Sequence, residues 1–492
     1  MTKRVESESN GISTTVRSPS HRSRSNGGSD FISSLPDEVL QHILSYIPTE
    51  YAVRTSALSK RWKHVWRETP SLSFHCHTWD HHPVSISKTL ASFFTAPKLT
   101  SFHIHVTFNP NNSSLTSSSH VNSWIELALS READKISLVI IGSDNVLPDL
   151  FFTNSSVKQL RLALGHRGSY DYRNMIPKPT VVWTSLRNLS LECFSLPDES
   201  LANILSGCPM LESLVLINCP KLGHLDLSNS PKLTRLEIVF GPYFGTLKIV
   251  APHIQYLKLI GSLEPCTLVD VSSLTDAYFS LNYVGETTRG DGFHQDMVLK
   301  MLQKLQNVEN LTIGPIVLQL LSVAELCGLP FPQLQAKSLT VTTMVVRSVI
   351  PSLARLLQNS PGLQKITLNT ISYRGIPDAE FNRHLRKQGL NPDGCWRLEY
   401  GDFPTTKQTY SHCVVATRAK SKHVVSFIKL VLQHSKAVDT VVLRLGGYLN
   451  ATEYEKLLRM VPTFTGNKNV RTRGQGKRLL NVLKITPRTV CV

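Results

Sequence analysis

Apolar residues near the front of the chain recur at helical spacing in three short runs. The first run follows Leu35-Pro36, where a proline and two carboxylates suit the opening turn of a helix, and it ends before Pro48. A second run begins at Thr49, and a third covers 58–66 with two tryptophans. The apolar face of the first run is formed by Leu40, Ile43, Leu44 and Ile47. Helices this short cannot bury all of these side chains among themselves, so we expect an apolar face that requires a partner.

A different pattern occupies the middle of the chain, in which alternating leucines follow a proline. A small residue, a proline, any residue and an apolar residue open the sequence L-x-x-L-x-L. Alternating apolar positions predict strands with one buried face, and the proline interrupts any helix before them. The motif starts at Ala96-Pro97, Cys208-Pro209, Cys219-Pro220, Ser230-Pro231, Ala251-Pro252 and Ser360-Pro361, and copies without the proline start at Val157, Leu186, Val308 and Val438.

The spacing of these copies divides the array into two kinds of repeat. The distances from Val157 to Leu186 and on to Leu211 suit a strand with a helix behind it. Between 211 and 254 the copies are only ten or eleven residues apart, so we expect bare turns behind those strands. Residues 150–370 should then form one curved, mostly parallel sheet. Four of its strands are expected side by side in the order 214–216, 225–227, 236–238 and 257–259.

Strand parity converts this pattern into a surface. If the leucines point into the core, the residues between them point to the open, concave side of the sheet. A mixed polar row on such a surface is typical of a solenoid that binds proteins, although each residue taken alone could simply be solvated. The residues expected to face a target are His103, His105, Arg161, Glu192, His224, Asp226, Ser228, Glu237, Lys248 and Lys258.

The front segment resembles the F-box, the helical module that docks cullin-RING ubiquitin ligases through a Skp-type adaptor. The resemblance is carried by Leu35-Pro36, the Ile43/Leu44 pair, Ile47-Pro48 and the run from Ala52 through Ser59-Lys60-Arg61-Trp62 to Trp66, which is similar to the version in large plant families. An ordinary helical hairpin packed on its own domain is the alternative. The resemblance implies that the adaptor binds Leu35, Pro36, Leu40, Ile43, Leu44, Ile47, Pro48, Leu58, Ser59, Arg61 and Trp62.

The leucine pattern resembles leucine-rich repeats of the irregular kind found in F-box/LRR proteins. The predicted fold class is therefore α/β: a three-helix F-box followed by an irregular solenoid with a curved parallel sheet, with a plain α/β domain as the alternative. A helix and a strand within 420–446 and a second helix from Thr452 to Met460 are loosely similar to a C-terminal FBD module. The expected organisation is a disordered tail at 1–29, the F-box at 30–76, repeats at 90–374, a repeat cap or FBD-like module at 375–464 and a basic, flexible tail at 465–492.

The net charge of +17 raises nucleic-acid binding as a competing function. Part of this excess lies in the two tails, which are rich in serine, glycine, asparagine and threonine, and such ends are more often solvated termini than binding domains. The nine cysteines include no CxxC, and no secretory segment opens the chain, so we expect reduced thiols and a nuclear and/or cytoplasmic location. No apolar run approaches the roughly 20 residues of a membrane helix.

The densest cluster of ligand-like residues is His75-Cys76-His77 with Asp80 and His81-His82. Histidine and cysteine suit zinc, but the strand-like residues before the cluster and Pro83 after it predict a polar loop, and no second cluster completes a site. We expect neither a metal nor another cofactor. No G-x-S-x-G motif, phosphate-binding loop or local signature of a catalytic cysteine is present.

The sequence therefore predicts a non-catalytic subunit of a ubiquitin ligase. The F-box would bind a Skp-type adaptor and, through it, a cullin, while the solenoid would bind a target protein for ubiquitination. The alternatives are a nucleic-acid-binding protein that uses its basic tails and a leucine-rich-repeat scaffold with no ligase role. Binding to the Skp-type adaptor separates the first reading from both others.

Overall fold

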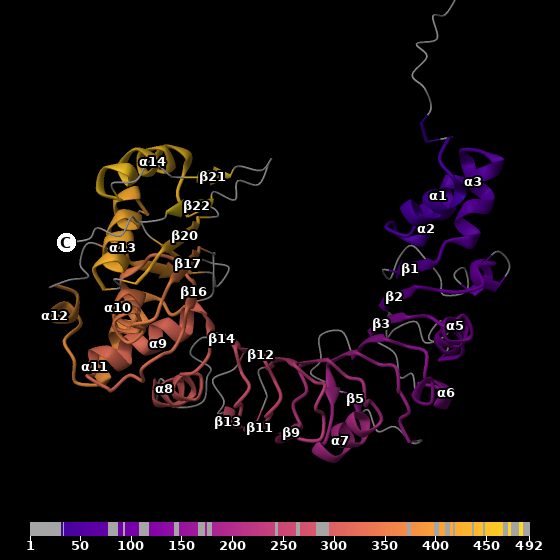
Figure 1. Cartoon of the computed structure of the whole chain (residues 1–492), viewed down its shortest axis with the longest axis horizontal. Helices are drawn as coiled ribbons and strands as arrows, with labels where there is room; N and C mark the ends of the chain where they lie inside the picture. The colour runs from indigo at the N-terminus through magenta and orange to yellow at the C-terminus, as the bar shows by residue number, and fades with distance from the viewer. Residues whose placement is uncertain are drawn as a thin grey trace, which may run out of the picture.

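Alternating leucines build one long curved sheet, which gives the molecule the shape of an arc (Figure 1). The computed structural model describes residues 31–32, 34–76, 87–91, 94–107, 118–141, 147–165, 173–174, 180–241, 245–261, 266–281, 295–370, 375–397, 403–408, 414–416, 419–434, 437–445, 448–465, 471–473 and 482–485. The strands of the long sheet, in spatial order, are β1 (Ser71–Cys76), β2 (Ser101–Thr107), β3 (Lys135–Ile141), β4 (Gln159–Gly165), β6 (Asn188–Glu192), β8 (Ser213–Ile217), β10 (Arg235–Val239), β12 (Tyr256–Gly261), β14 (Asp276–Leu281), β15 (Asn310–Ile313), β16 (Ser338–Thr342), β17 (Lys365–Asn369), β20 (Thr440–Arg444), β22 (Val482–Ile485) and β21 (Arg471–Arg473).

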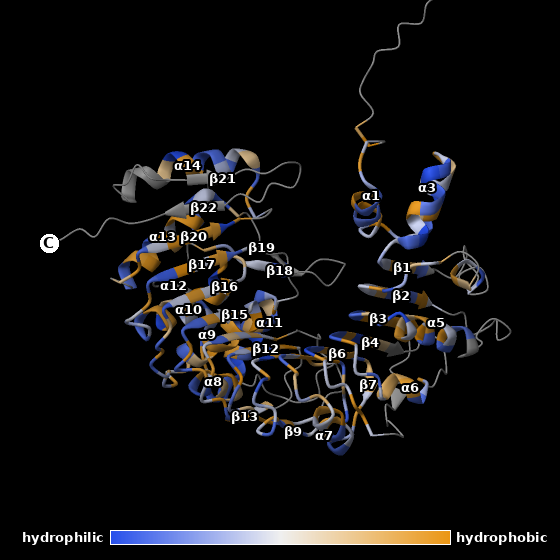
Figure 2. Ribbon diagram, turned by 45° about the vertical axis from the view of Figure 1, so that its right-hand side comes forward, coloured by the Kyte–Doolittle hydropathy of each residue, from blue (hydrophilic) through white to orange (hydrophobic). Residues whose placement is uncertain are grey.

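Neighbouring strands from β1 to β20 are parallel, and their core-facing residues are aligned. Leu214, Leu236 and Leu257, for example, lie in one row and are buried. Helices cover the outer, convex side of the arc (Figures 1 and 2). These helices include α5 (Ser118–Ser130), α6 (Asp149–Phe152), α7 (Asp198–Ser206), α8 (Gln295–Lys304), α9 (Pro315–Leu326) and α10 (Ile350–Gln358). The predicted fold class, a helical module followed by an irregular solenoid with a curved parallel sheet, is confirmed.

The prediction for the closely spaced repeats was wrong in its strand order. Strands β9 (His224–Asp226), β11 (Leu247–Val250) and β13 (Cys266–Asp270) form a separate three-stranded parallel sheet behind the long one. Segment 225–227 is therefore not inserted between β8 and β10, which pair directly, and short strands replace the expected bare turns. A step of ten or eleven residues leads from a strand of the long sheet to a strand of the three-stranded sheet behind it, and not to the next strand of the long sheet. The full repeat runs from one strand of the long sheet to the next, within the roughly 20–29 residues of a leucine-rich repeat.

The N-terminal module, residues 31–70, has its own small core. It consists of α1 (Asp37–Leu44), α2 (Thr49–Arg54), η1 (Thr55–Ala57), α3 (Lys60–Val65) and η2 (Trp66–Glu68). Hydrogen bonds attach it to the solenoid: Thr49 Oγ1 accepts from Ser73 N at 2.8 Å, and the Arg67 carbonyl accepts from Thr95 N at 3.0 Å and Ala96 N at 3.2 Å. The long sheet begins at Ser71, so β1 already belongs to the solenoid. The module covers the first edge of the sheet. Its core is formed by Leu40, Leu44, Ala52, Val65 and Trp66.

The C-terminal part continues the sheet through β20. The predicted order of helix, strand and helix is confirmed as α13 (Ser421–His434), β20 and α14 (Ala451–Thr465). The tail predicted to be flexible contains β22, which pairs antiparallel with β20, and β21, which pairs with β22. The edge of β20 offers backbone groups with which a following segment can pair. The predicted N-terminal tail lies outside the described residues.

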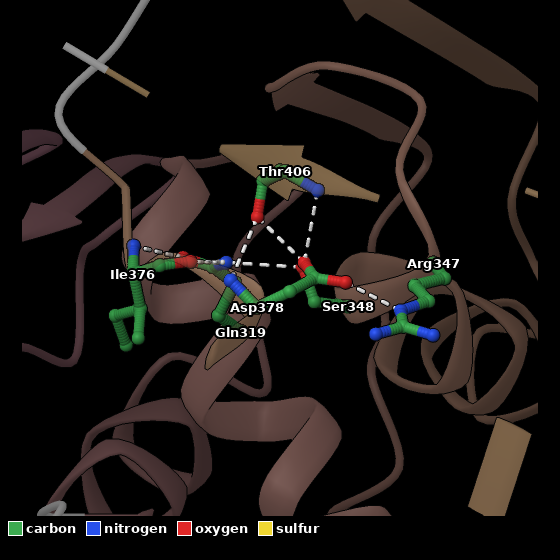
Figure 3. A network of polar contacts seen from close by, with 6 residues as sticks. All are labelled: Gln319, Arg347, Ser348, Ile376, Asp378 and Thr406. Carbon is green, nitrogen blue, oxygen red and sulfur yellow. Dashed lines mark hydrogen bonds and ion pairs between the residues drawn. The ribbon is translucent and has the colours of Figure 1, made fainter. Parts of the chain in front are cut away.

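A buried polar network holds the long segment between β17 and α13, residues 370–420, against the solenoid (Figure 3). We call this segment the excursion. This excursion contains α11 (Asp378–Lys387), α12 (Pro392–Arg397), β18 (Thr406–Gln408) and β19 (Val414–Ala416). Asp378 pairs with Arg347, and its Oδ1 accepts from Thr406 N at 3.1 Å and from Thr406 Oγ1 at 2.5 Å. The Gln319 side chain donates to Ile376 O at 2.8 Å and accepts from Ile376 N at 2.9 Å. Two distant segments of the chain are thereby fixed to α9 and to the 3₁₀ turn that includes Arg347.

Replacing Gly207 with alanine is expected to destabilise the fold by about 1–3 kcal/mol, because an added Cβ would overlap the carbonyl group of Val181. The Gly207 carbonyl also accepts a hydrogen bond from Trp183 N at 2.9 Å, so the two segments cannot simply separate. Gly245→Ala is the matched control, since no atom lies within 4 Å of its added Cβ. Denaturant unfolding measures both variants, and equal midpoints would contradict the prediction.

Glu453 should make the stability of the C-terminal helices depend on pH. Hydrogen bonds from Lys456 and from the backbone and hydroxyl of Ser421 lower the pKa of Glu453 to about 2 from its ordinary value of 4.5. The folded state therefore favours the carboxylate, and this stabilisation is present above pH 4.5 and is lost as the pH falls towards 2. The melting temperature of Glu453→Gln should lie below that of the native chain at neutral pH, and the difference should vanish near pH 2. Glu455→Gln, an exposed position on the same helix, should show no such trend.

Candidate functional site

The N-terminal module carries a second apolar stripe that its own core does not use. Leu40 and Leu44 point inward from α1, whereas Val39, Ile43 and Tyr46 follow one another at helical spacing on the outer side. Ile43 is 46% exposed and Tyr46 is 76% exposed. Leu58, which follows η1, is 69% exposed. An amphipathic helix in water normally places polar residues on this side, so the module presents a surface for a partner.

The structure sorts the predicted adaptor-binding residues into three groups. Pro36, Ile43, Leu58 and Ser59 are exposed. Partial exposure is found for Leu35, Ile47, Pro48, Arg61 and Trp62. Leu40 and Leu44, at 0% and 3% exposure, belong to the core, so they support the adaptor-binding surface from inside and do not form part of it. Sequence reasoning placed them with Ile43 because one wide apolar stripe on α1 serves both purposes.

Two of the predicted residues also organise the module internally. Arg61 pairs with Asp37 at 2.6 Å and donates to the Leu35 carbonyl, which connects α3 to the beginning of α1. The Ser59 hydroxyl accepts from Trp62 N at 3.5 Å and caps α3. Sequence reasoning missed several exposed apolar residues. Their signal would have been large apolar side chains outside the buried stripes, on the polar side of α1 and α2 and in the turns before and after α1. These residues are Phe31, Ile32, Val39, Tyr46 and Tyr51.

The concave face of the long sheet carries the second candidate surface. Ladder pairing aligns one residue from each strand into a central row, and the predicted His103, Arg161, Glu237 and Lys258 all belong to it. His105 and Glu192 occupy the neighbouring row. From β1 to β17 the central row consists of Ser73, His103, Ser137, Arg161, Ser190, Val215, Glu237, Lys258, Tyr278, Thr312, Thr340 and Thr367.

Four residues predicted for this concave face lie elsewhere. His224 and Asp226 are on β9 and Lys248 is on β11, so these three belong to the sheet on the convex side, and Ser228 lies in the turn that follows β9. The sequence correctly predicted which side chains are exposed, because all four are exposed and alternate with buried apolar residues. The error was the assignment of β9 and β11 to the long sheet. The two surfaces point away from each other, so a single partner segment would not contact both.

Histidines gather at the end of the concave face nearest the N-terminal module. The His75 ring centroid lies 5.0 Å from that of His103 and 6.1 Å from that of His105. Burial, together with the neighbouring His75, His105 and Arg161, lowers the pKa of His103 to about 4. Among the described residues, no three or more histidine, cysteine, aspartate or glutamate side chains are placed so that they could hold a metal ion, and the rest of the cluster in the sequence, His77 to His82, lies outside these residues.

Charged and aromatic side chains meet in the middle of the concave face. The Arg235 guanidinium stands 3.8 Å from the centre of the Tyr256 ring, and the Lys258 ammonium 5.8 Å from that of Tyr278. Glu237 accepts from both cations, at 2.5 Å from Arg235 and 2.9 Å from Lys258. Burial disfavours the charged form of Glu237, but the hydrogen bonds from Lys258 and Arg235 outweigh it and lower the pKa of this carboxyl.

The described cysteines differ from activated nucleophiles. Burial raises the pKa of Cys208, Cys219 and Cys266 to about 12, so these thiols remain protonated at neutral pH. They are free of disulfide bonds. None of the described helices is long and apolar enough to cross a membrane.

A helical module with an uncovered apolar stripe is joined to a leucine-rich solenoid with a polar concave face, so the chain is a two-part protein with a separate candidate binding surface on each part. Comparison with known families agrees with this assignment. The F-box domain profile matches residues 32–74, and a profile described as "FBD-associated F-box protein At5g56370, LRR repeats" matches residues 121–272. The N-terminal module is thus an F-box.

Similar proteins cover almost the whole chain. The F-box/LRR-repeat protein At5g02910 of Arabidopsis thaliana is 48% identical over 447 residues, covering 90% of this chain and 94% of that protein. The putative F-box/LRR-repeat protein At3g28410 of the same plant is 47% identical, with 90% and 93% coverage, and the F-box/LRR-repeat protein At3g03360 is 42% identical, with 93% and 92% coverage. The chain belongs to the F-box/LRR-repeat family.

Proposed function

We propose that this chain is the substrate-recognition subunit of a Skp–cullin–F-box ubiquitin ligase. The observation that carries the proposal is the outer apolar stripe of α1 and of the turn after it, in which Ile43 and Tyr46 lie outside the module's own core. Such a stripe is stabilised when a partner covers it. The match to the F-box domain makes a Skp-type adaptor the expected partner, and a cullin would join through that adaptor.

The proposal assigns target binding to the concave sheet and gives the chain no covalent step. Hydrogen bonds through Thr49 and Arg67 connect the F-box to the first repeat, which holds a bound target in a defined direction from the adaptor. Ubiquitin transfer is then promoted by proximity, since it raises the effective concentration of target lysines near the ubiquitin-carrying enzyme. A nuclear and/or cytoplasmic location is part of this proposal and can be checked by imaging a fluorescent fusion.

Size-exclusion chromatography of the full chain with a purified Skp-type adaptor tests the proposal. Co-elution in a complex that survives raised salt is expected, because the contact is mainly apolar. Separate elution of the two proteins would refute the ligase assignment and favour a scaffold without a ligase role. Adaptor-independent binding to duplex DNA that weakens steeply with salt would instead support the nucleic-acid alternative.

A further inference from the structure

The middle of the concave face is unusual because each of three neighbouring strands adds an apolar residue to the open side at the same position of the ladder. In β8, Leu214 and Leu216 are buried in the core, yet Ile217 on the open side is also apolar. Ladder pairing aligns Ile217 with Val239 on β10, and Val239 with Ile260 on β12. All three open-side residues are partly exposed. They contribute an apolar strip that the core does not require.

The strip has polar boundaries along the arc. In the same row, Glu192 on β6 precedes Ile217, and Ser280 on β14 follows Ile260. Val215 widens the strip towards the central row, where it stands beside Glu237. An apolar patch with a polar border on a rigid sheet is typical of the centre of a protein-binding site.

Charged and aromatic side chains lie directly beside the strip. Arg235 and Lys258 each stand near a tyrosine ring, and both are held by Glu237, whose side chain is only 15% exposed. Tyrosine and arginine are the residue types that most often dominate binding energy at interfaces. Because Glu237 fixes both cations before a partner arrives, less conformational entropy is lost on binding.

The charge of this group favours an anionic partner. Two cations share one carboxylate, so Arg235, Glu237 and Lys258 together carry a net charge of +1 beside the apolar strip. The one carboxylate aligned with the patch on β14, Asp276, lies beside Tyr256 and accepts a hydrogen bond from Thr275 Oγ1 at 2.8 Å. A guanidinium has five donors and an ammonium three, more than the two oxygens of Glu237 can engage. A second carboxylate can therefore bind Arg235 and Lys258 without displacing Glu237.

We propose that the central concave patch, defined as Val215, Arg235, Val239, Tyr256, Lys258 and Tyr278 together with Ile217 and Ile260, binds an extended acidic segment of the target protein. The segment carries an aspartate or glutamate within a few positions of an apolar side chain. The apolar side chain lies on the strip, and the carboxylate binds the two cations. This inference rests on the proposed function and names the class of target that the solenoid selects.

Panning a phage library of random peptides on the full chain tests the inference. Peptides with an acidic residue close to an apolar one should be enriched. Fluorescence anisotropy with the most enriched peptide, synthesised with a fluorescein label, should show at least a tenfold higher Kd for Lys258→Glu. Replacing the acidic residue of that peptide with lysine should restore part of the affinity for this variant. Lys248→Glu is the matched control, because it changes the charge equally on the convex sheet and should leave the Kd unchanged.

Three outcomes would overturn the inference: no enrichment of acidic–apolar peptides, equal effects of Lys258→Glu and Lys248→Glu, or no effect of either. If circular dichroism shows that Lys258→Glu does not fold, Val239→Asn replaces it, and a Kd that does not rise tenfold would contradict the apolar strip. Adaptor capture is measured on the same preparations. Failed capture with intact, patch-dependent peptide binding would reject the ligase role and leave the peptide site standing, so the two proposals fail separately.

Discussion

Replacing Ile43 and Leu58 with aspartate should weaken adaptor binding a hundredfold or more. Both side chains are exposed in the free chain, at 46% and 69%, and neither belongs to the buried core of the F-box. Covering an aliphatic side chain is worth about 1.5–3 kcal/mol, and two such losses correspond to roughly a hundredfold in Kd. The introduced carboxylates would also lose hydration at the interface. Surface plasmon resonance with immobilised adaptor measures the change.

Leu150→Asp is the matched control for this pair, since Leu150 on α6 is 64% exposed but lies on the solenoid. It should bind the adaptor as tightly as the native chain does. Leu44→Ala should also reduce capture, but by destabilising the F-box core by about 2–5 kcal/mol, which thermal unfolding would reveal. Full-strength capture by the Ile43→Asp/Leu58→Asp variant would remove the α1 surface as the adaptor site.

Helical periodicity located the F-box, but it could not show which of its apolar residues are buried in the core and which are exposed on the surface. Ile43 and Leu44 are adjacent on α1 and both fit a helical stripe, yet one is exposed and the other is buried. The sequence does show that the apolar stripe is wide, because Val39, Ile43 and Tyr46 add positions that a small core cannot cover. Which side of a wide stripe faces inward depends on how the three helices pack, and that is a tertiary property.

Alternation likewise identified the strands without assigning them to sheets. Leu225 and Leu227 around β9 repeat the spacing of Leu214 and Leu216 in β8, since a strand in either sheet buries one face. A local signal did exist at the end of the back strands. Asp226 Oδ1 accepts from Ser228 N at 2.9 Å, and the corresponding turn after β13 uses Asp270 in the same way. An aspartate closes two of the three convex strands with such a turn, whereas β11 ends at Val250 without one.

The polar network around Asp378 was beyond any local reading of the sequence. Gln319 lies in a largely apolar helix, and its partner Ile376 is 57 positions away. A buried glutamine is stable there only because backbone groups from a distant segment satisfy its amide. Periodicity describes neighbours along one element, so it contains no information about pairings of this kind.

Breaking this network should release the excursion that it holds. Asp378→Ala removes the carboxylate that pairs with Arg347 and accepts from the backbone and hydroxyl of Thr406 (Figure 3). Removing one partner of a buried ion pair typically costs about 3–5 kcal/mol, and because Arg347 is partly exposed we expect a loss of about 3 kcal/mol. Denaturant unfolding measures the loss of stability.

Hydrogen–deuterium exchange then distinguishes release of the excursion from general loosening. In Asp378→Ala, the amides of Ile376 and Thr406 should exchange faster, while those of β8 and β10 should stay protected, because Gln319 alone would have to hold the segment against α9. Asp393→Ala, an exposed position on α12, should leave both regions unchanged. Uniformly faster exchange across the solenoid would mean that Asp378 supports the whole repeat array. Unchanged exchange at Thr406 would mean that the network does not hold the excursion, and the apolar contacts of Ile376 and Phe381 with the core would then be what attaches it.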